Sequence, residues 1–163
     1  MKNATFTVEF VRHVLAKDRG PNGERDVFER DGTGALIFQQ SWWYSAFRKA
    51  IEGAALRGIK PSDIDMDPFV RAETQQWTRR YQPGKTRTHE TIMPGTQVTF
   101  HASVADHVTE SNLTEILKRM GKYVGISPFG YKLGFGRFRV VSVQVDPSAS
   151  ADVAARQHTL LGE

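Results

Sequence analysis

The chain alternates hydrophobic and polar residues with a period of two in two separate stretches. The first covers residues 5–10 and the second covers residues 97–104. This period puts every second side chain on the same side of an extended backbone, so both stretches are predicted to be strands with one buried face. A closing strand is predicted over residues 138–145, before Asp146-Pro147. The open face of the sheet is expected to carry Thr5, Thr7, Thr99 and His101.

Two other stretches repeat their hydrophobic residues at helical spacing. The first starts at Ser41, which can cap the first turn, and is expected to end near Gly58. Its hydrophobic face comprises Trp43, Phe47, Ile51 and Ala54. The second starts at Thr109 or Ser111. Its hydrophobic stripe comprises Leu113, Ile116, Leu117 and Met120.

Between the first helix and the second strand, the pattern predicts a basic β-hairpin. Residues 77–81 and 85–92 flank Gln82-Pro83-Gly84. Pro followed by Gly suits the central positions of a type II turn, because Pro fixes a negative φ and Gly accepts a positive one. The charged residues 17–26 are expected to form a solvated loop, and residues 61–63 to begin a turn or a short helical turn.

In chain order the elements are a strand, a helix, a hairpin pair, a helix and a strand. This is the order of an α+β, ferredoxin-like (βαββαβ) fold, in which two helices cover one face of an antiparallel sheet. A chain of 163 residues suits one domain. We therefore predict a single domain over residues 1–147 that carries the basic β-hairpin as an insertion. Residues 148–163 are expected to form a C-terminal tail, either loose or with a short helix.

The composition narrows the possible chemistry. The chain has no cysteine, which excludes disulfides, thiolate metal ligands and cysteine nucleophiles. No apolar run is long enough for a signal peptide or a membrane span, so a cytoplasmic protein is expected. Close pairs of metal-ligating residues are absent, and neither a metal nor a cofactor is predicted. The net charge of +4 permits attraction to phosphate without demonstrating it.

Two segments resemble motifs of one protein superfamily. Residues 36–50 resemble the segment in which RAMP-superfamily CRISPR-associated proteins pass from a short strand, through a serine turn, into an Arg-containing first helix. Residues 130–138 resemble that superfamily's glycine-rich loop before the last strand, and end in Gly134-Phe135-Gly136-Arg137-Phe138. The resemblance implies a ferredoxin-like RNA-binding protein, either a backbone subunit that coats guide RNA or a nuclease that processes it.

The glycine-rich loop is the first candidate site. Gly134 and Gly136 lack a Cβ, so their backbone can approach a phosphate closely and offer its N–H groups. Lys132 and Arg137 would add positive charge. The alternative is that these glycines only form a tight turn or bulge that leads into the strand.

Further candidates for nucleic-acid contact lie on the hairpin, the first helix and the end of strand one. The hairpin concentrates four cations near aromatic residues that could stack on bases, although hairpins are often basic for solubility alone. The resemblance implies that the helix start faces an RNA backbone, while Trp42 could equally fill a subunit contact or the edge of the core. The strand end could instead simply face solvent. These candidates are Arg12, Lys17, Trp42, Arg48, Lys49, Arg79, Arg80, Lys85 and Arg87.

The favoured hypothesis is a non-catalytic protein that binds single-stranded RNA, or DNA, as a homo-oligomer or a subunit of a ribonucleoprotein complex. A second hypothesis is a metal-independent endoribonuclease with His13 or His101 as general base, although a lone His is more often structural. A third is a phage-encoded anti-defence protein that copies the fold and binds another protein.

Overall fold

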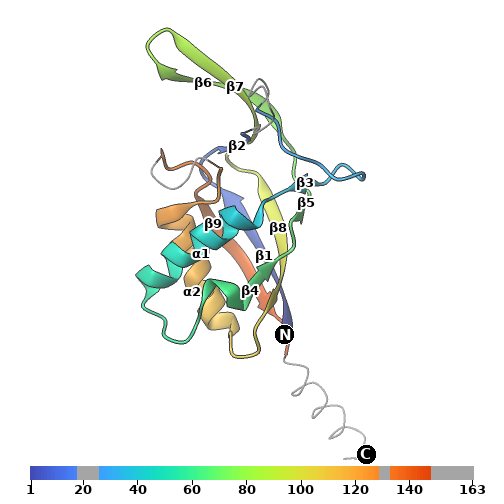
Figure 1. Cartoon of the computed structure of the whole chain (residues 1–163), viewed down its shortest axis with the longest axis vertical. Coiled ribbons are helices and arrows are strands. Elements are labelled where there is room, and N and C mark those ends of the chain that lie inside the picture. Colours follow the sequence, from blue (N-terminus) through green and yellow to red (C-terminus); the bar gives the residue numbers. More distant parts are fainter. Residues whose placement is uncertain (18–25, 129–132, 148–163) are drawn as a thin grey trace, which may run out of the picture.

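The computed structural model describes residues 1–17, 26–128 and 133–147, so the predicted tail and Lys132 lie outside the described residues. Its centre is a four-stranded antiparallel sheet with the order β4-β8-β1-β9. These strands are β1 (Lys2–Phe10), β4 (Ile64–Met66), β8 (Gln97–Val104) and β9 (Phe138–Val145). Helices α1 (Gln40–Ala54) and α2 (Glu110–Arg119) cover one face of this sheet (Figure 1). The predicted α+β, ferredoxin-like fold is confirmed.

The second strand of this fold was not predicted. It is β4, which follows the short 3-10 helix η1 (Pro61–Asp63) and pairs with the end of β8. Ile64 and Met66 are buried and Asp65 between them is exposed. Three residues are too few to show a period of two against the surrounding polar sequence, so only pairing with β8 reveals this strand.

The open face of the sheet carries the predicted polar residues. Thr5 pairs with His101 and Thr7 pairs with Thr99 across β1 and β8. The two hydroxyls of Thr7 and Thr99 are 2.8 Å apart, and the Thr5 hydroxyl lies 3.3 Å from Nδ1 of His101. The alternation is thus confirmed, because a slip of one residue would send these side chains into the core.

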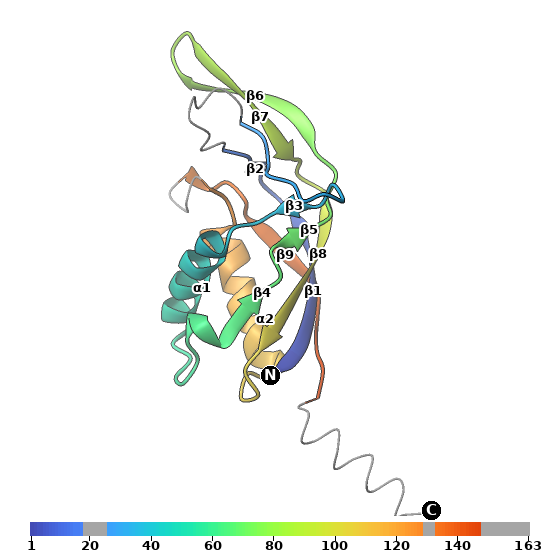
Figure 2. The same cartoon turned by 45° about the vertical axis from the view of Figure 1, so that its right-hand side comes forward.

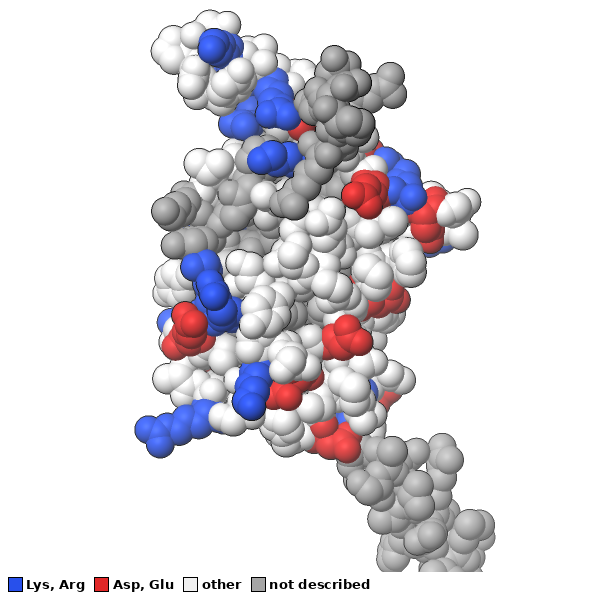
Figure 3. Space-filling model, in the orientation of Figure 1, with Lys and Arg blue, Asp and Glu red and all other residues white. Residues whose placement is uncertain are grey.

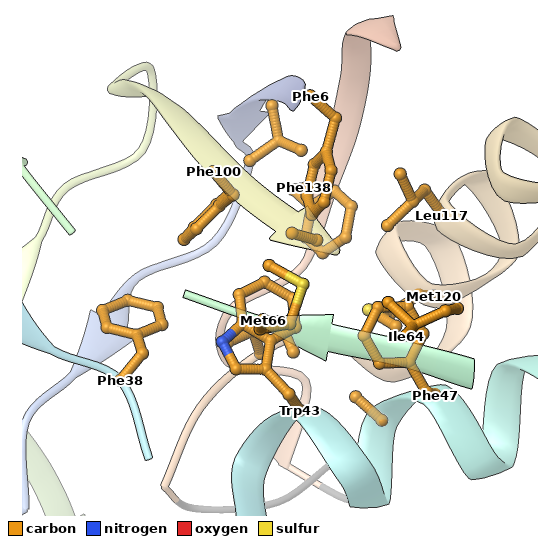
Figure 4. Packing of buried hydrophobic residues seen from close by; sticks show 14 of the residues in the cluster. Phe6, Phe38, Trp43, Phe47, Ile64, Met66, Phe100, Leu117, Met120 and Phe138 are labelled. Carbon is orange, nitrogen blue, oxygen red and sulfur yellow. The ribbon is translucent and has the colours of Figure 1, made fainter. Parts of the chain in front are cut away.

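The helices bury the predicted stripes against the other face of the sheet, except that Ala54 is only half-buried. Trp43 packs edge-on against Phe100, with ring centroids 4.9 Å apart, and Phe100 contacts Phe6 at 5.5 Å (Figure 4). Burial of one such side chain stabilises the fold by about 1.5–3 kcal/mol. From α2 and the turn after it, the predicted stripe is fully buried: Leu113, Ile116, Leu117 and Met120.

The helix ends differ in part from expectation. Thr109 is the N-cap of α2, and its hydroxyl accepts the N–H of Asn112 at 3.1 Å. Ser41 is not the cap of α1, because the helix already begins at Gln40 and Gln39 occupies the cap position without a side-chain hydrogen bond. Helix α1 also ends earlier than predicted, at a left-handed Ala55 with a φ of 53°.

The hairpin rises from one end of the sheet and forms a separate small sheet. Strands β6 (Gln75–Gln82) and β7 (Lys85–Ile92) pair with each other, and β7 also pairs with β2 (Val14–Leu15). Gly84 has a φ of 74°, as a type II turn at Pro83-Gly84 requires. A two-stranded sheet of β3 (Leu36–Ile37) and β5 (Phe69–Val70) lies below the hairpin (Figure 2).

One further helical element, the π-helical turn η2 (Met120–Val124), extends α2. Among residues 1–17, 26–128 and 133–147, no helix has the length and hydropathy needed to cross a membrane.

Candidate nucleic-acid interface

The glycine-rich loop lies directly against the end of β1. Gly134 and Gly136 both have a φ of 74°, which favours glycine. A Cβ on Gly136 would lie 1.9 Å from the carbonyl oxygen of Ile126, and the Gly136 N–H already donates to the carbonyl of His13 at 2.8 Å. The tight-turn alternative therefore explains Gly136, whose amide is occupied inside the protein.

Gly134 is in a different position. The nearest atoms to a Cβ placed there are Cζ and Nε of Arg137, both at 3.8 Å. The Arg137 guanidinium thus lies beside this glycine, and its Nε is buried without a hydrogen-bond partner in the described part of the chain. Gly134 itself is buried, so the half-buried Arg137 side chain is the described part of the loop that can still approach a phosphate.

The loop and the end of β1 form one unit through backbone hydrogen bonds. The N–H groups of Val11 and Arg12 both donate to the carbonyl of Arg137, at 2.9 and 3.2 Å. The side chain of Arg12 is exposed, whereas that of Arg137 is half-buried. Two cations separated by most of the sequence therefore meet at this corner of the sheet.

The hairpin packs against this unit through aromatic contacts. The imidazole of His13 stacks on the indole of Trp77, with centroids 4.0 Å apart and planes 23° apart. Burial, reinforced by the positive charge of Arg12, lowers the pKa of His13. The guanidinium of Arg79 lies over the ring of Phe135, 5.9 Å from its centroid. The hairpin and the glycine-rich loop are thus held side by side.

Arg79 also contacts a buried histidine. Its Nε–H donates to Nε2 of His89 at 3.0 Å, while Nδ1 of His89 donates to the carbonyl of Ala16 at 2.8 Å. Both contacts require a neutral imidazole with its proton on Nδ1. Burial lowers the pKa of His89 and outweighs the opposing effects of the Ala16 carbonyl and Asp26. His89 therefore orients Arg79 toward the loop.

Arg87 is bound to Asp26, a residue predicted to lie in a solvated loop. Asp26 is only 5% exposed and accepts hydrogen bonds from Nε and Nη2 of Arg87, the latter at 2.8 Å. The loop prediction is wrong at this residue because no local pattern shows that β7 supplies a cation to it. Arg79 and Arg87 are cross-strand neighbours on the same face of the hairpin. The four hairpin cations therefore do not form a single cluster.

A second buried carboxylate secures the base of the hairpin. Glu90 accepts the backbone N–H of Phe28 at 2.8 Å, the hydroxyl of Thr74 at 2.8 Å and the guanidinium of Arg30. Burial alone would raise the pKa of Glu90, but these hydrogen bonds outweigh it and lower the pKa. The segment before β3 is thereby fixed to β7.

Arg80 and Lys85 differ from Arg79 and Arg87. Both are exposed, and neither forms an ion pair within the described ranges. Tyr81 beside them is 46% exposed, and Arg79 approaches its ring to 5.5 Å. Figure 3 shows Lys and Arg side chains over the hairpin on the face drawn, whereas Asp and Glu side chains gather lower on the molecule.

The remaining predicted residues lie elsewhere. Trp42 is half-buried, with its ring 5.4 Å from Phe38, so it fills the edge of the core. Arg48 is exposed and Lys49 half-buried on α1, in the helical layer and not at the hairpin. Lys17 is exposed just beyond β2.

The two histidines considered for catalysis do not come together. His101 is exposed on the open face opposite Thr5, whereas His13 follows the other end of β1. At about 3.3 Å per residue, Thr5 and Phe10 are already about 17 Å apart. Within the described ranges, no group of three or more potential metal ligands occurs.

The architecture is similar to that of a solved structure. A chain in the cryo-EM structure of the Type III-B Cmr-beta bound to cognate target RNA matches this chain with a TM-score of 0.59. The match covers 91% of this chain at 11% sequence identity, which shows a shared fold. The chain corresponds to 61% of the length of that chain. Neither a protein-family model nor a curated protein matches the sequence.

Proposed function

We propose that this chain is a non-catalytic protein that binds single-stranded nucleic acid, with a preference for RNA. Its binding site is the hairpin–loop surface, which we define by the exposed hairpin residues, the end of β1 and the glycine-rich loop. The surface comprises Arg12, Arg80, Tyr81, Lys85 and Arg137.

The observation that carries this proposal is the docking of the hairpin on the glycine-rich loop. The His13–Trp77 stack and the Arg79–Phe135 contact hold the two together. As a result, the part of the chain that carries the exposed Arg80 and Lys85 is fixed next to the corner that carries Arg12 and Arg137. Cations combined with an exposed aromatic ring match the needs of a single strand, which offers phosphates and unstacked bases.

The shared fold supports RNA as the ligand. The matched chain belongs to a complex bound to cognate target RNA. Together with the resemblance of residues 36–50 and 130–138 to RAMP-superfamily motifs, this favours a role as a subunit of a CRISPR ribonucleoprotein complex. In such a complex, copies of the chain would line up along one strand.

The test is a binding titration of the full chain with labelled single-stranded RNA, single-stranded DNA and duplex, from about 50 to 200 mM salt. We expect saturable binding that is tightest for single-stranded RNA and weakens with salt. The Arg80→Glu/Lys85→Glu variant should bind at least about tenfold more weakly, and its salt slope should decrease by about 1.4, because each phosphate contact to a single strand contributes about 0.7.

The matched control is Arg57→Glu/Lys60→Glu, which reverses two exposed charges after α1. The affinity of this variant for RNA should fall by less than about threefold, because only its net charge has changed. The proposal is overturned if the wild-type chain shows no saturable binding at low salt, or if the hairpin variant binds no more weakly than the control.

A further inference from the structure

A groove runs along the outer edge of β9, and its basic wall on α2 and η2 was not predicted from the sequence. It has a volume of about 590 Å³, and its apolar floor includes Phe138 and Val140. Strand β9 is the edge strand of the four-stranded sheet, and α2 with η2 forms the opposite wall. We call this feature the edge groove.

The lining of the edge groove is strongly basic. Five cations and no carboxylate line it: Arg12, Lys118, Lys122, Arg137 and Arg139. Arg139 is paired with Glu9 at 3.0 and 3.1 Å, so its charge is compensated. Across the described ranges, the other four form no ion pair. Unpaired like charges that line one groove favour an anion between them.

The backbone explains why the helical wall stands so near the strand. A Cβ on Gly121 would lie 2.1 Å from the carbonyl oxygen of Phe138, so only glycine permits this approach. Gly121 lies within the π-helical turn η2, which is closed by a 2.7 Å hydrogen bond from the Gly125 N–H to the carbonyl of Met120. Lys118 and Lys122, four residues apart, both line the groove.

An exposed aromatic ring, which does not itself line the groove, lies beside Lys122, which does. Tyr123 is 53% exposed, and its ring lies 5.5 Å from Cζ of Arg119 and 5.3 Å from Nζ of Lys122. Cations beside an aromatic face are the combination that stacks a base and contacts its phosphate.

The edge groove is continuous with the hairpin–loop surface because Arg12 and Arg137 belong to both. We infer that the edge groove binds a further segment of the same nucleic-acid strand, with its phosphates at Lys118 and Lys122 and a base on Tyr123. This inference rests on the proposed function and extends the strand from the glycine-rich loop around the edge of the sheet.

The experiment compares oligonucleotides of two lengths. A short RNA of about 4 nucleotides can fill only one surface, whereas one of about 16 nucleotides can fill both. For the wild-type chain we expect affinity to rise with length. In Lys118→Glu/Lys122→Glu the affinity for the long RNA should fall at least about tenfold, with a salt slope smaller by about 1.4, while the affinity for the short RNA should fall by less than about threefold, as in the charge control.

Two controls separate the groove from general charge and from the hairpin. Arg57→Glu/Lys60→Glu should lower the affinity for the short and the long RNA by the same factor. Arg80→Glu/Lys85→Glu should lower the affinity for the short RNA as well as for the long RNA. Photocrosslinking of a long 4-thiouridine RNA should label Tyr123 and be lost in Tyr123→Ala but kept in Tyr44→Ala, which removes a comparably exposed tyrosine of α1.

The inference is overturned if the wild-type chain binds RNA but the groove variant loses no more affinity on the long RNA than the Arg57→Glu/Lys60→Glu control. It is also overturned if the groove variant loses affinity for the short and the long RNA by the same factor. Absence of RNA binding by the wild-type chain would overturn the proposed function itself, so the two failures are distinguishable.

Discussion

The two faces of the hairpin use the same residue types for different purposes. Arg79 and Arg87 point toward the body of the protein and contact His89 and Asp26. Arg80, next to Arg79 in the chain, lies on the opposite face and is exposed. One face therefore fixes the hairpin to the sheet, and Arg80 on the other face is available for phosphate, whereas Lys85 shares the face of Arg87 and is exposed at the turn. The comparison teaches that side-chain direction and distance from the sheet, rather than local charge density, separate structural cations from candidate binding cations.

The largest effect among the tests of this difference between the two faces is expected when the Arg87 side chain is removed. Arg87→Ala leaves the Asp26 carboxylate buried without its cation. We expect the free energy of unfolding to fall by about 3 kcal/mol, at the low end for a broken buried pair because the Arg87 side chain is itself 36% exposed. Urea unfolding followed by circular dichroism measures this change.

Arg80→Ala is the matched control, since it removes an exposed arginine from the same hairpin. It should change stability by less than about 0.5 kcal/mol. Equal destabilisation by the two substitutions would show that the two faces of the hairpin do not differ in their structural role.

A smaller effect is expected from the aromatic contact between the hairpin and β1. Trp77→Ala removes the ring that stacks on His13, and the free energy of unfolding should fall by about 1 kcal/mol. Because burial is the main cause of the lowered pKa of His13, the pKa should rise toward its ordinary value when the indole is removed. An NMR titration of the His13 imidazole measures this shift. Tyr81→Ala should leave the His13 titration unchanged, and a shift of the same size in that variant would contradict the stacked arrangement.

The mildest perturbation is a change of pH. The folded-state pKa of His89 lies below its ordinary value, so the unfolded chain takes up a proton first as the pH falls. The stability that the neutral, buried His89 contributes to the fold is fully present above about pH 6.5, and it is lost as the pH falls through the folded-state pKa. His13 acts in the same direction.

Unfolding titrations between about pH 7 and 5 check this expectation. His89→Gln should flatten the pH dependence relative to the wild-type chain, while His101→Gln, at an exposed position on the open face, should retain it. A wild-type stability that rises on acidification in this range would contradict a neutral buried His89.

Much of the architecture was predictable from local pattern. The alternation in β1 and β8 and the stripes of α1 and α2 identified which faces are buried, because each element shows its period within a few residues. The last strand was predicted with the same bounds as β9. The strand β4 was missed because three residues carry no readable period.

The sequence by itself determined the fold class, the turn at Pro83-Gly84 and the presence of a glycine-rich loop ahead of the last strand. These features depend on backbone preferences and on hydrophobic spacing, which are local properties. It also located the basic residues of the hairpin, but only as a group.

Only the tertiary structure decided what each of those basic residues does. The pairing of Arg87 with Asp26 joins residues 61 positions apart, and Gly136 bonds to His13 across most of the chain. The edge groove likewise brings Arg12 beside Lys118 and Lys122. Such contacts depend on how the sheet places distant segments together, and neither charge nor spacing along the chain encodes that placement in a readable form.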